Sequence, residues 1–233
     1  MATQKTKQKI VASFLTLVGE RGWNGFEMTD IAASAGVKLS VLRAEFSGKT
    51  ACLRAFLSEV DQTVLDGIDE DMADQPARER LFDILMSRLD ALAPHKDALR
   101  EMKRAAGRDP QLALKINREA VTSMRWMLTA AGMPASGPRA SVMAQGLAIA
   151  FARVVDTWLT DEDPGLARTM SALDRQLDEG ESWMGRLDSV SRFLKPLFAA
   201  ARNRRAGKSR PEPTEAGDET AGGASPGAAS PAA

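Results

Sequence analysis

Apolar residues recur at every third or fourth position along most of the chain, which is the spacing of one helix face. The alternating runs of β-branched residues that are typical of strands are missing from the sequence. The first apolar stripe predicts a helix over 5–21 that ends at the Gly22 break, and it consists of Ile10, Phe14, Leu17 and Val18. The pattern therefore predicts an all-α protein.

Two short helices are predicted next, over 30–35 and 41–46. Thr29 and Ser40 precede them and are suitable N-cap residues. Gly36 suits the left-handed turn between them, because glycine has no Cβ to clash there. Their inward-facing apolar residues are Ile31, Ala32, Ala35, Val37, Leu42 and Phe46. Two short helices joined by a glycine turn are typical of a helix-turn-helix unit.

Longer apolar stripes follow and predict a helical body. Asp109 and Asp163 each precede a proline, a combination that suits the start of a helix. Residues 139–160 are apolar on more than one face, so we expect this helix to be central or covered by a partner. The predicted body helices begin near Thr50 and then cover 77–92, 110–130, 139–160, 164–179 and about 181–203.

The net charge of zero over 233 residues hides an uneven distribution. Residues 1–56 contain eight basic and four acidic side chains, a net charge of +4. Residues 57–201 contain 18 basic and 23 acidic side chains, a net charge of −5, and the rest carries +1. A basic first segment on an acidic body indicates two roles in one chain, although ordinary scatter also produces a difference of this size.

The sequence offers few residues for catalysis or metal binding. A single cysteine, Cys52, excludes a disulfide framework and a cysteine zinc site, and a single histidine, His95, excludes a multi-histidine metal centre. Phosphate-binding glycine loops and nucleophile elbows are also missing, so we expect neither an enzyme nor a cofactor. No apolar run approaches the ~18 residues that cross a membrane, and we expect a cytoplasmic protein.

The strongest motif lies around the predicted helix-turn-helix, at Met28, Thr29, Asp30, Ile31, Ala32, Ala35, Gly36, Val37, Leu42, Phe46, Lys49 and Leu53. With these residues, the segment of about 8–57 resembles the DNA-binding domain of the TetR family of transcriptional regulators. The resemblance implies that Thr29 and Lys49 contact the DNA backbone and that the second short helix enters the major groove. The implied DNA-facing residues of that helix are Lys38, Leu39, Ser40, Val41, Arg43 and Ala44.

The sequence departs from the family pattern on this recognition helix. Arg43 stands where the family usually has an aromatic residue, and Glu45 stands where it usually has histidine or tyrosine. Arginine can contact phosphate or guanine, but an acidic side chain on a DNA-facing helix repels phosphate. Two alternatives stay open: a functional DNA-binding domain, and a domain that keeps the fold without binding DNA.

A second set of motifs occurs in order along the body, at Arg88 to Ala98, Trp126 to Leu128, Ala130 to Gly132, Trp158 to Asp161, Thr169-Met170 and Ala172 to Arg175. With them, residues of about 80–187 are similar to the lipid-binding protein family of ubiquinone (coenzyme Q) biosynthesis, whose fold is itself TetR-like. This resemblance implies an apolar cavity for isoprenoid-type lipids and a last helix that touches membranes.

Flexible methionines and other apolar side chains of the body are candidates for lining such a cavity, with ordinary core packing as the alternative. The candidates are Met102, Leu112, Ile116, Met124, Met127, Met143, Leu147, Phe151 and Trp158. The predicted last helix is amphipathic and basic, which suits either an anionic membrane surface or packing on the body. Its candidates for peripheral membrane contact are Trp183, Leu187, Phe193, Leu194 and Phe198.

Two hypotheses of function follow. The first is a homodimeric TetR-like transcriptional regulator that binds operator DNA and a small apolar or isoprenoid-type effector. The second is a membrane-associated, lipid-binding accessory protein of ubiquinone biosynthesis with a vestigial helix-turn-helix. The predicted segments are a DNA-binding head, a body for ligand binding and for dimerisation through 139–160 and 164–179, and a disordered tail rich in Ala, Gly and Pro: 1–49, 50–205 and 206–233.

Overall fold

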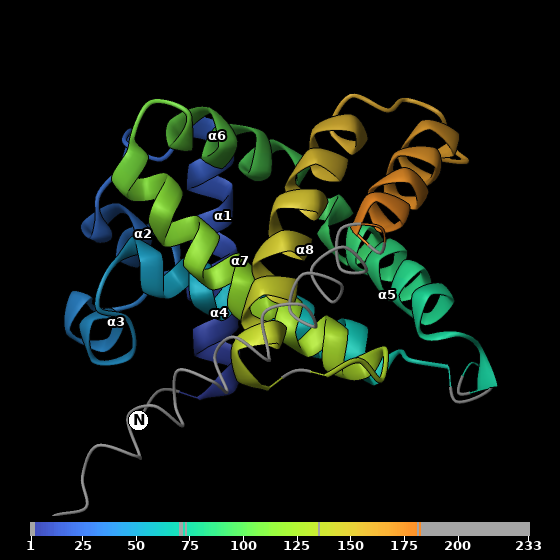
Figure 1. The fold of residues 1–233 in the computed structure, drawn as a ribbon. Coiled ribbons are helices and arrows are strands. Elements are labelled where there is room, and N and C mark those ends of the chain that lie inside the picture. The colour runs from blue at the N-terminus through green and yellow to red at the C-terminus, as the bar shows by residue number, and fades with distance from the viewer. Residues whose placement is uncertain (1–2, 70–71, 73, 135, 181, 183–233) are drawn as a thin grey trace, which may run out of the picture. The chain divides into compact units, whose positions relative to one another are not determined.

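The structure, a computed structural model, describes residues 3–69, 72, 74–134, 136–180 and 182. Helices make up its regular secondary structure, and these residues contain no strand, so the all-α prediction is confirmed (Figure 1). In chain order the helices are α1 (Gln4–Arg21), α2 (Met28–Ser34), α3 (Leu39–Glu45), α4 (Lys49–Asp66), α5 (Ala77–Leu92), a 3₁₀ turn (Ala93–His95), α6 (Lys96–Ala106), α7 (Pro110–Ala130), α8 (Gly137–Trp158) and a helix over 167–180.

The helix α2 begins earlier than the sequence predicts. Glu27, not Thr29, is its N-cap, because the backbone N–H of Glu27 donates to the Asp30 carboxylate at 2.7 Å in a reciprocal capping box. Thr29 therefore lies inside the first turn of α2 with its side chain exposed.

The helix α3 also begins earlier than predicted, with Lys38 rather than Ser40 at its N-cap. No side chain caps this helix, so the hydroxyl of Ser40 is not used as a cap and its residue is exposed. The turn between α2 and α3 depends on Gly36, which has φ +61°, as predicted for a glycine there. The N–H of Val37 then donates to the carbonyl of Ala32 at 3.0 Å and closes the turn.

The helix α4 connects the helix-turn-helix to the rest of the fold. It starts three residues after Phe46, contacts α1, and continues to pack against α5 and α7. Its buried side chains belong to the same hydrophobic core as those of α1, α2 and α8, and they are Cys52, Leu53, Phe56, Val60 and Val64. One continuous core therefore runs from the helix-turn-helix into the body.

The helices α7 and α8 pack side by side and carry much of the body core (Figure 1). Asp109 caps α7 as predicted, with its carboxylate accepting from the N–H of Gln111 at 2.9 Å. The helix α8 buries one face, on which lie Ala140, Ala144, Leu147, Ala148, Phe151, Val154 and Trp158. Its opposite face leaves Val142 and Ile149 exposed.

The last described helix starts at residue 167, three residues later than predicted. Pro164 lies in a turn before it, because the carboxylate of Asp163 accepts from the N–H groups of Gly165 and Ala167, both at 3.1 Å. Asp161 accepts both the N–H and the hydroxyl of Thr169 and fixes the first turn. These bonds lower the pKa of Asp161, with the hydroxyl of Thr169 as the largest cause.

Candidate DNA-binding surface and ligand groove

One face of α3 presents most of the residues that the sequence assigns to DNA. Leu42 and Phe46 are buried and anchor the helix to the core. The side chains that point away from this anchor are exposed, and they are Lys38, Leu39, Ser40, Arg43 and Ala44. Leu39 is 48% exposed and is the large apolar member of this surface. Val41 is half-buried at the edge of this surface, which we call the α3 face.

Glu45 does not lie on the α3 face as an opposing charge. Its side chain is only 12% exposed, and its carboxylate pairs with the ammonium of Lys7 on α1 at 2.9 Å. The structure thus pairs this acid with α1, whereas the sequence placed it on the DNA-facing helix without a partner; its effect on DNA binding stays a prediction. Sequence reasoning missed Lys7 because the pairing depends on how α1 crosses α3, which no local pattern contains.

Lys49 has a structural role that the sequence did not predict. Its ammonium donates to the carbonyls of Trp23, at 2.9 Å, and Phe26, and it lies 4.3 Å from the centre of the Phe26 ring. These contacts hold the loop between α1 and α2 against the start of α4. Backbone contact by Lys49 and by Thr29 stays a prediction, and only Thr29 is exposed at its position.

Two ion pairs connect α4 to the body. In the first, the guanidinium of Arg54 donates two bonds to the carboxylate of Glu119 on α7, at 2.7 and 2.9 Å. Glu119 is 7% exposed, and its pKa is lowered mainly by the hydrogen bond from Arg54. Arg54 itself stays largely in solvent, so this pair lies at the edge of the core.

The second ion pair, between Asp61 and Arg88, is buried more deeply in the core. The guanidinium of Arg88 on α5 and the hydroxyl of Ser123 on α7 both donate to the same carboxylate oxygen of Asp61 on α4. Arg88 is 2% exposed and lies 5.8 Å from the ring centre of Phe151, and its Nε has no hydrogen-bond partner among the described residues. Burial lowers the pKa of Arg88, and Asp61 opposes this. The signal was present in the sequence, since Arg88 falls on an otherwise apolar face of α5.

A groove of about 540 Å³ runs along α8, a size within the range of small-molecule sites (roughly 300–1,000 Å³). We call it the α8 groove. Its apolar wall comes from α5, α7, α8 and the helix over 167–180: Leu81, Leu128, Met133, Val142, Met143, Leu147, Ile149 and Leu177. Its charged lining residues are Arg78, Arg139, Arg153 and Glu179.

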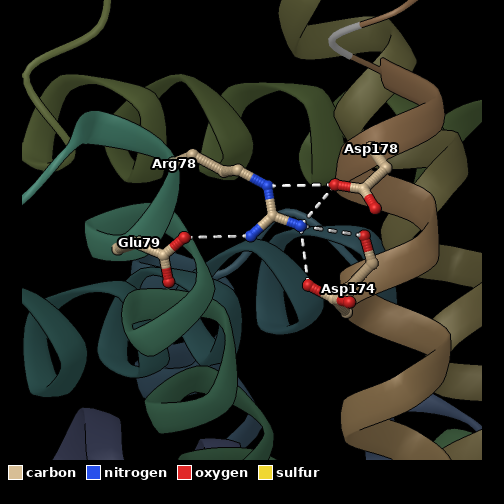
Figure 2. A network of polar contacts seen from close by, with 4 residues as sticks. All are labelled: Arg78, Glu79, Asp174 and Asp178. Atoms are coloured by element: carbon tan, nitrogen blue, oxygen red, sulfur yellow. Dashed lines mark hydrogen bonds and ion pairs between the residues drawn. The ribbon is translucent and has the colours of Figure 1, made fainter.

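Arg78 stabilises one wall of the α8 groove, and its charge is paired with carboxylates of the protein instead of being available to a ligand. Figure 2 shows its guanidinium between the carboxylates of Glu79, Asp174 and Asp178. Its bond to the carboxylate of Asp174 is 2.6 Å long. These contacts tie the first turn of α5 to the helix over 167–180 and raise the pKa of Arg78.

The predicted cavity residues divide into two groups. Met143 and Leu147 line the α8 groove. The others do not line it; Met102, Leu112, Met124, Met127, Phe151 and Trp158 are buried and Ile116 is half-buried. Trp158 also lines a separate hollow of about 550 Å³, where the ammonium of Lys96 lies 4.5 Å from its ring centre.

The isolated cysteine and histidine are packing residues. Cys52 is fully buried, and burial raises the pKa of its thiol to about 12, so the reactive thiolate is not formed near neutral pH. His95 packs edge-to-face on Phe56 at 5.1 Å, and burial lowers its pKa. Among the described residues no group of three potential ligands could hold a metal ion.

The membrane candidates cannot be placed in the fold. Trp183, Leu187, Phe193, Leu194 and Phe198 lie outside the described residues, as do the helix predicted over about 181–203, apart from residue 182, and the predicted tail. In the part of the chain that the structure describes, no helix is both long and apolar enough to cross a membrane.

The fold and the α3 face together define an all-α helix-turn-helix protein. Comparisons with known proteins show which other proteins share this fold. No protein-family model and no curated protein matches the sequence. The TetR transcriptional regulator from Nitrosomonas europaea matches with a TM-score of 0.60 and 22% identity, over 77% of this chain and 99% of that chain. A TetR transcriptional regulator from Rhodococcus sp. RHA1 matches with a TM-score of 0.53 and 17% identity, over 76% and 96% of the two chains.

A third similar structure contains a bound ligand. The transcriptional regulator FadR from Bacillus subtilis, in complex with stearoyl-CoA, matches with a TM-score of 0.50 and 18% identity, over 73% of this chain and 97% of that chain. The chain therefore has the fold of the TetR-family transcriptional regulators, as the sequence predicted.

Proposed function

We propose that the protein is a ligand-responsive transcriptional regulator that binds operator DNA through the α3 face. The observation that carries the proposal is the exposed pair Lys38 and Arg43, which lies on a helix whose only acid, Glu45, is paired with Lys7. A helix with outward cations and an anchored inner face suits entry into the major groove. Arg43 can donate two bonds to a guanine, and Lys38 can contact a phosphate.

The proposed regulator is a homodimer, because two α3 faces are needed to read two successive major grooves. The helices α8 and 167–180 are the candidates for the dimer interface. In support, Met170 on the helix over 167–180 is exposed and does not line the α8 groove, so its apolar side chain is available to a second subunit.

The proposed effector is a small apolar or amphiphilic molecule. The α8 groove supports this, because it is lined mainly by apolar side chains and includes the predicted residues Met143 and Leu147. The stearoyl-CoA complex of the similar FadR structure is consistent with an effector that has an apolar chain. An effector changes DNA affinity only if it binds one arrangement of the two heads better than another.

Operator selection from random duplex DNA, with the full chain at moderate salt, tests the proposal. We expect enrichment of a roughly palindromic site, and a loss of affinity of about tenfold or more for Arg43→Ala. The matched control is Arg108→Ala, which removes the same charge from an exposed position between α6 and α7, outside the α3 face and the candidate dimer interface, and leaves affinity within about twofold. A wild-type protein without sequence preference, or an Arg43→Ala variant that binds like the wild type, would overturn the proposal.

A further inference from the structure

The α8 groove differs from an ordinary core gap in its charge. Its walls are apolar side chains along α8, whereas its mouth carries arginines at both ends of the helix. Arg139 and Arg153 are 14 positions apart, which is about 21 Å along a helix. The groove therefore combines an apolar wall with one arginine toward each end of α8.

Arg153 is the arginine that is best placed to receive an anion. Its guanidinium donates to the side-chain amide of Gln176 at 3.3 Å, and among the described residues no carboxylate forms an ion pair with it. Arg78, in contrast, is surrounded by three carboxylates (Figure 2). Glu179 also lines the groove, and its carboxylate accepts from the amide of Gln176 at 2.8 Å.

Gly146 opens the groove at its middle. It lies on α8 between Val142 and Ile149, and a Cβ added at this position would meet no atom within 4 Å. Within the part of the chain that the structure describes, the space at Gly146 is thus open, and Leu81 and Leu177 line the same groove. A flexible alkyl chain fits such a site, because it gains from leaving water without needing hydrogen-bond partners.

We propose that the α8 groove binds a single-chain amphiphile, with its apolar chain along α8 at Gly146 and its carboxylate at Arg153. A carboxylate matches the planar guanidinium of an arginine and forms charge-assisted hydrogen bonds with it. The inference deepens the proposed function and rests on it, because it names the effector class and the place where that effector binds. A free fatty acid has this carboxylate, whereas an acyl thioester lacks it and offers only the phosphates of its headgroup.

Equilibrium dialysis of the full chain tests the site without DNA. The probes are dodecanoate, dodecanol and dodecanoyl-CoA, each below its micelle concentration. We expect dodecanoate to bind more tightly than dodecanol. The relative affinities for dodecanoate and dodecanoyl-CoA then show whether the groove prefers a free acid or a thioester. Equal affinity for dodecanoate and dodecanol would overturn the assignment of Arg153.

Gly146→Phe fills the groove, and we expect it to weaken dodecanoate binding by about tenfold or more. The matched control is Ala152→Phe, an exposed position on α8 that does not line the groove, and it leaves binding unchanged. Gly146→Leu repeats the test with a smaller side chain, and circular dichroism verifies that each variant is folded. If both Gly146 variants bind dodecanoate like the wild type, the site assignment is wrong.

Arg153→Gln removes the proposed anion contact and should reduce the preference for dodecanoate over dodecanol by about tenfold. Arg139→Gln removes the same charge at the other end of the groove and should reduce it less. If Gly146→Phe dissociates the dimer while leaving dodecanoate binding intact, the groove is a subunit contact and the inference fails. If dodecanoate binds as expected but operator selection finds no preferred DNA, the proposed function fails and the amphiphile site stands.

Discussion

The carboxylate of Glu45 faces Lys7 on α1, so the α3 face presents Lys38 and Arg43 without an opposing charge beside them. An exposed ion pair adds little to stability, commonly ~0–1 kcal/mol. Its effect on binding can be larger, since a carboxylate released next to a phosphate backbone repels it in every complex that forms. Lys7 is therefore expected to act on DNA affinity through the charge of Glu45.

Lys7→Ala should lower the affinity for the selected operator more than Lys5→Ala, which removes the same charge from an exposed position on the same helix. The reason is that Lys7, unlike Lys5, forms an ion pair with Glu45. In a background of Glu45→Gln the two lysine variants should become equal, since no carboxylate remains to be released. Fluorescence anisotropy with labelled operator DNA measures all the affinities. A Lys7 effect that persists in the Glu45→Gln background would contradict this prediction.

Glu119 makes the stability of the fold depend on pH. Its pKa is lowered in the folded protein by the hydrogen bond from Arg54, so the carboxylate contributes stability above its unfolded pKa of about 4.3. This contribution is lost as the pH falls through the folded pKa. Urea unfolding of Glu119→Gln should consequently show a shallower loss of unfolding free energy between about pH 5 and pH 3 than the wild type. Parallel profiles for the two proteins would be evidence against this role.

At the scale of helices, the start of α4 depends on Lys49. Its ammonium bridges two carbonyls of the α1–α2 loop, those of Trp23 and Phe26, and no side chain caps α4. The lysine therefore connects the α1–α2 loop, including the ring of Phe26, to the start of α4.

Lys49→Ala should lower the free energy of unfolding by about 1.5–3 kcal/mol, because two part-buried carbonyls lose a charged donor. Lys38→Ala is the matched comparison, since Lys38 is exposed at the N-cap of α3 without a side-chain cap bond. It should leave stability within about 0.5 kcal/mol and weaken operator binding instead. Chemical denaturation and operator titration of both variants separate the two roles. Equal unfolding free energies of the two variants would contradict the structural role of Lys49.

The helices themselves were largely predictable from the sequence, and their ends were not. The spacing of apolar residues predicted the helices α1, α4, α7 and α8, because each of them buries one face in the core. The start of α2 was predicted at Thr29, since threonine caps helices well, but the reciprocal bonds of Glu27 and Asp30 outcompete it. A helix start was expected at His95 but no range was predicted for α6, because most of its residues are polar and only Ala98 and Met102 are buried.

For the molecule as a whole, the α3 face could be predicted and the α8 groove could not. The predicted DNA-facing residues Lys38 to Ala44 lie at or near consecutive positions of one short helix and its N-cap, so their order in the sequence is their order in space. The groove requires the helix over 167–180 to lie against α5, which the pairing of Arg78 with Asp174 and Asp178 produces across about a hundred residues. Most of the predicted cavity side chains proved to be core because sequence alone cannot say which apolar faces meet.

The network of Asp61, Arg88 and Ser123 ties α4 to α5 and α7 at the centre of this arrangement. Asp61→Asn should lower the free energy of unfolding by about 3–5 kcal/mol, because it leaves the buried charge of Arg88 without its partner. The double variant Asp61→Leu with Arg88→Met removes both charges and should recover most of that loss. Thermal and urea unfolding measure the difference, and a double variant as unstable as Asp61→Asn would argue against the charge as the cause.

The buried thiol of Cys52 has a practical consequence for studying this protein. Because Cys52 is the only cysteine and its pKa is raised to about 12, maleimide or nitroxide reagents should not modify it while the protein stays folded. A cysteine introduced at an exposed position, such as Ser40 on α3, would then be the single reactive thiol of each copy. Pulsed electron spin resonance between two such labels could read the separation of the recognition helices directly, with and without an added amphiphile.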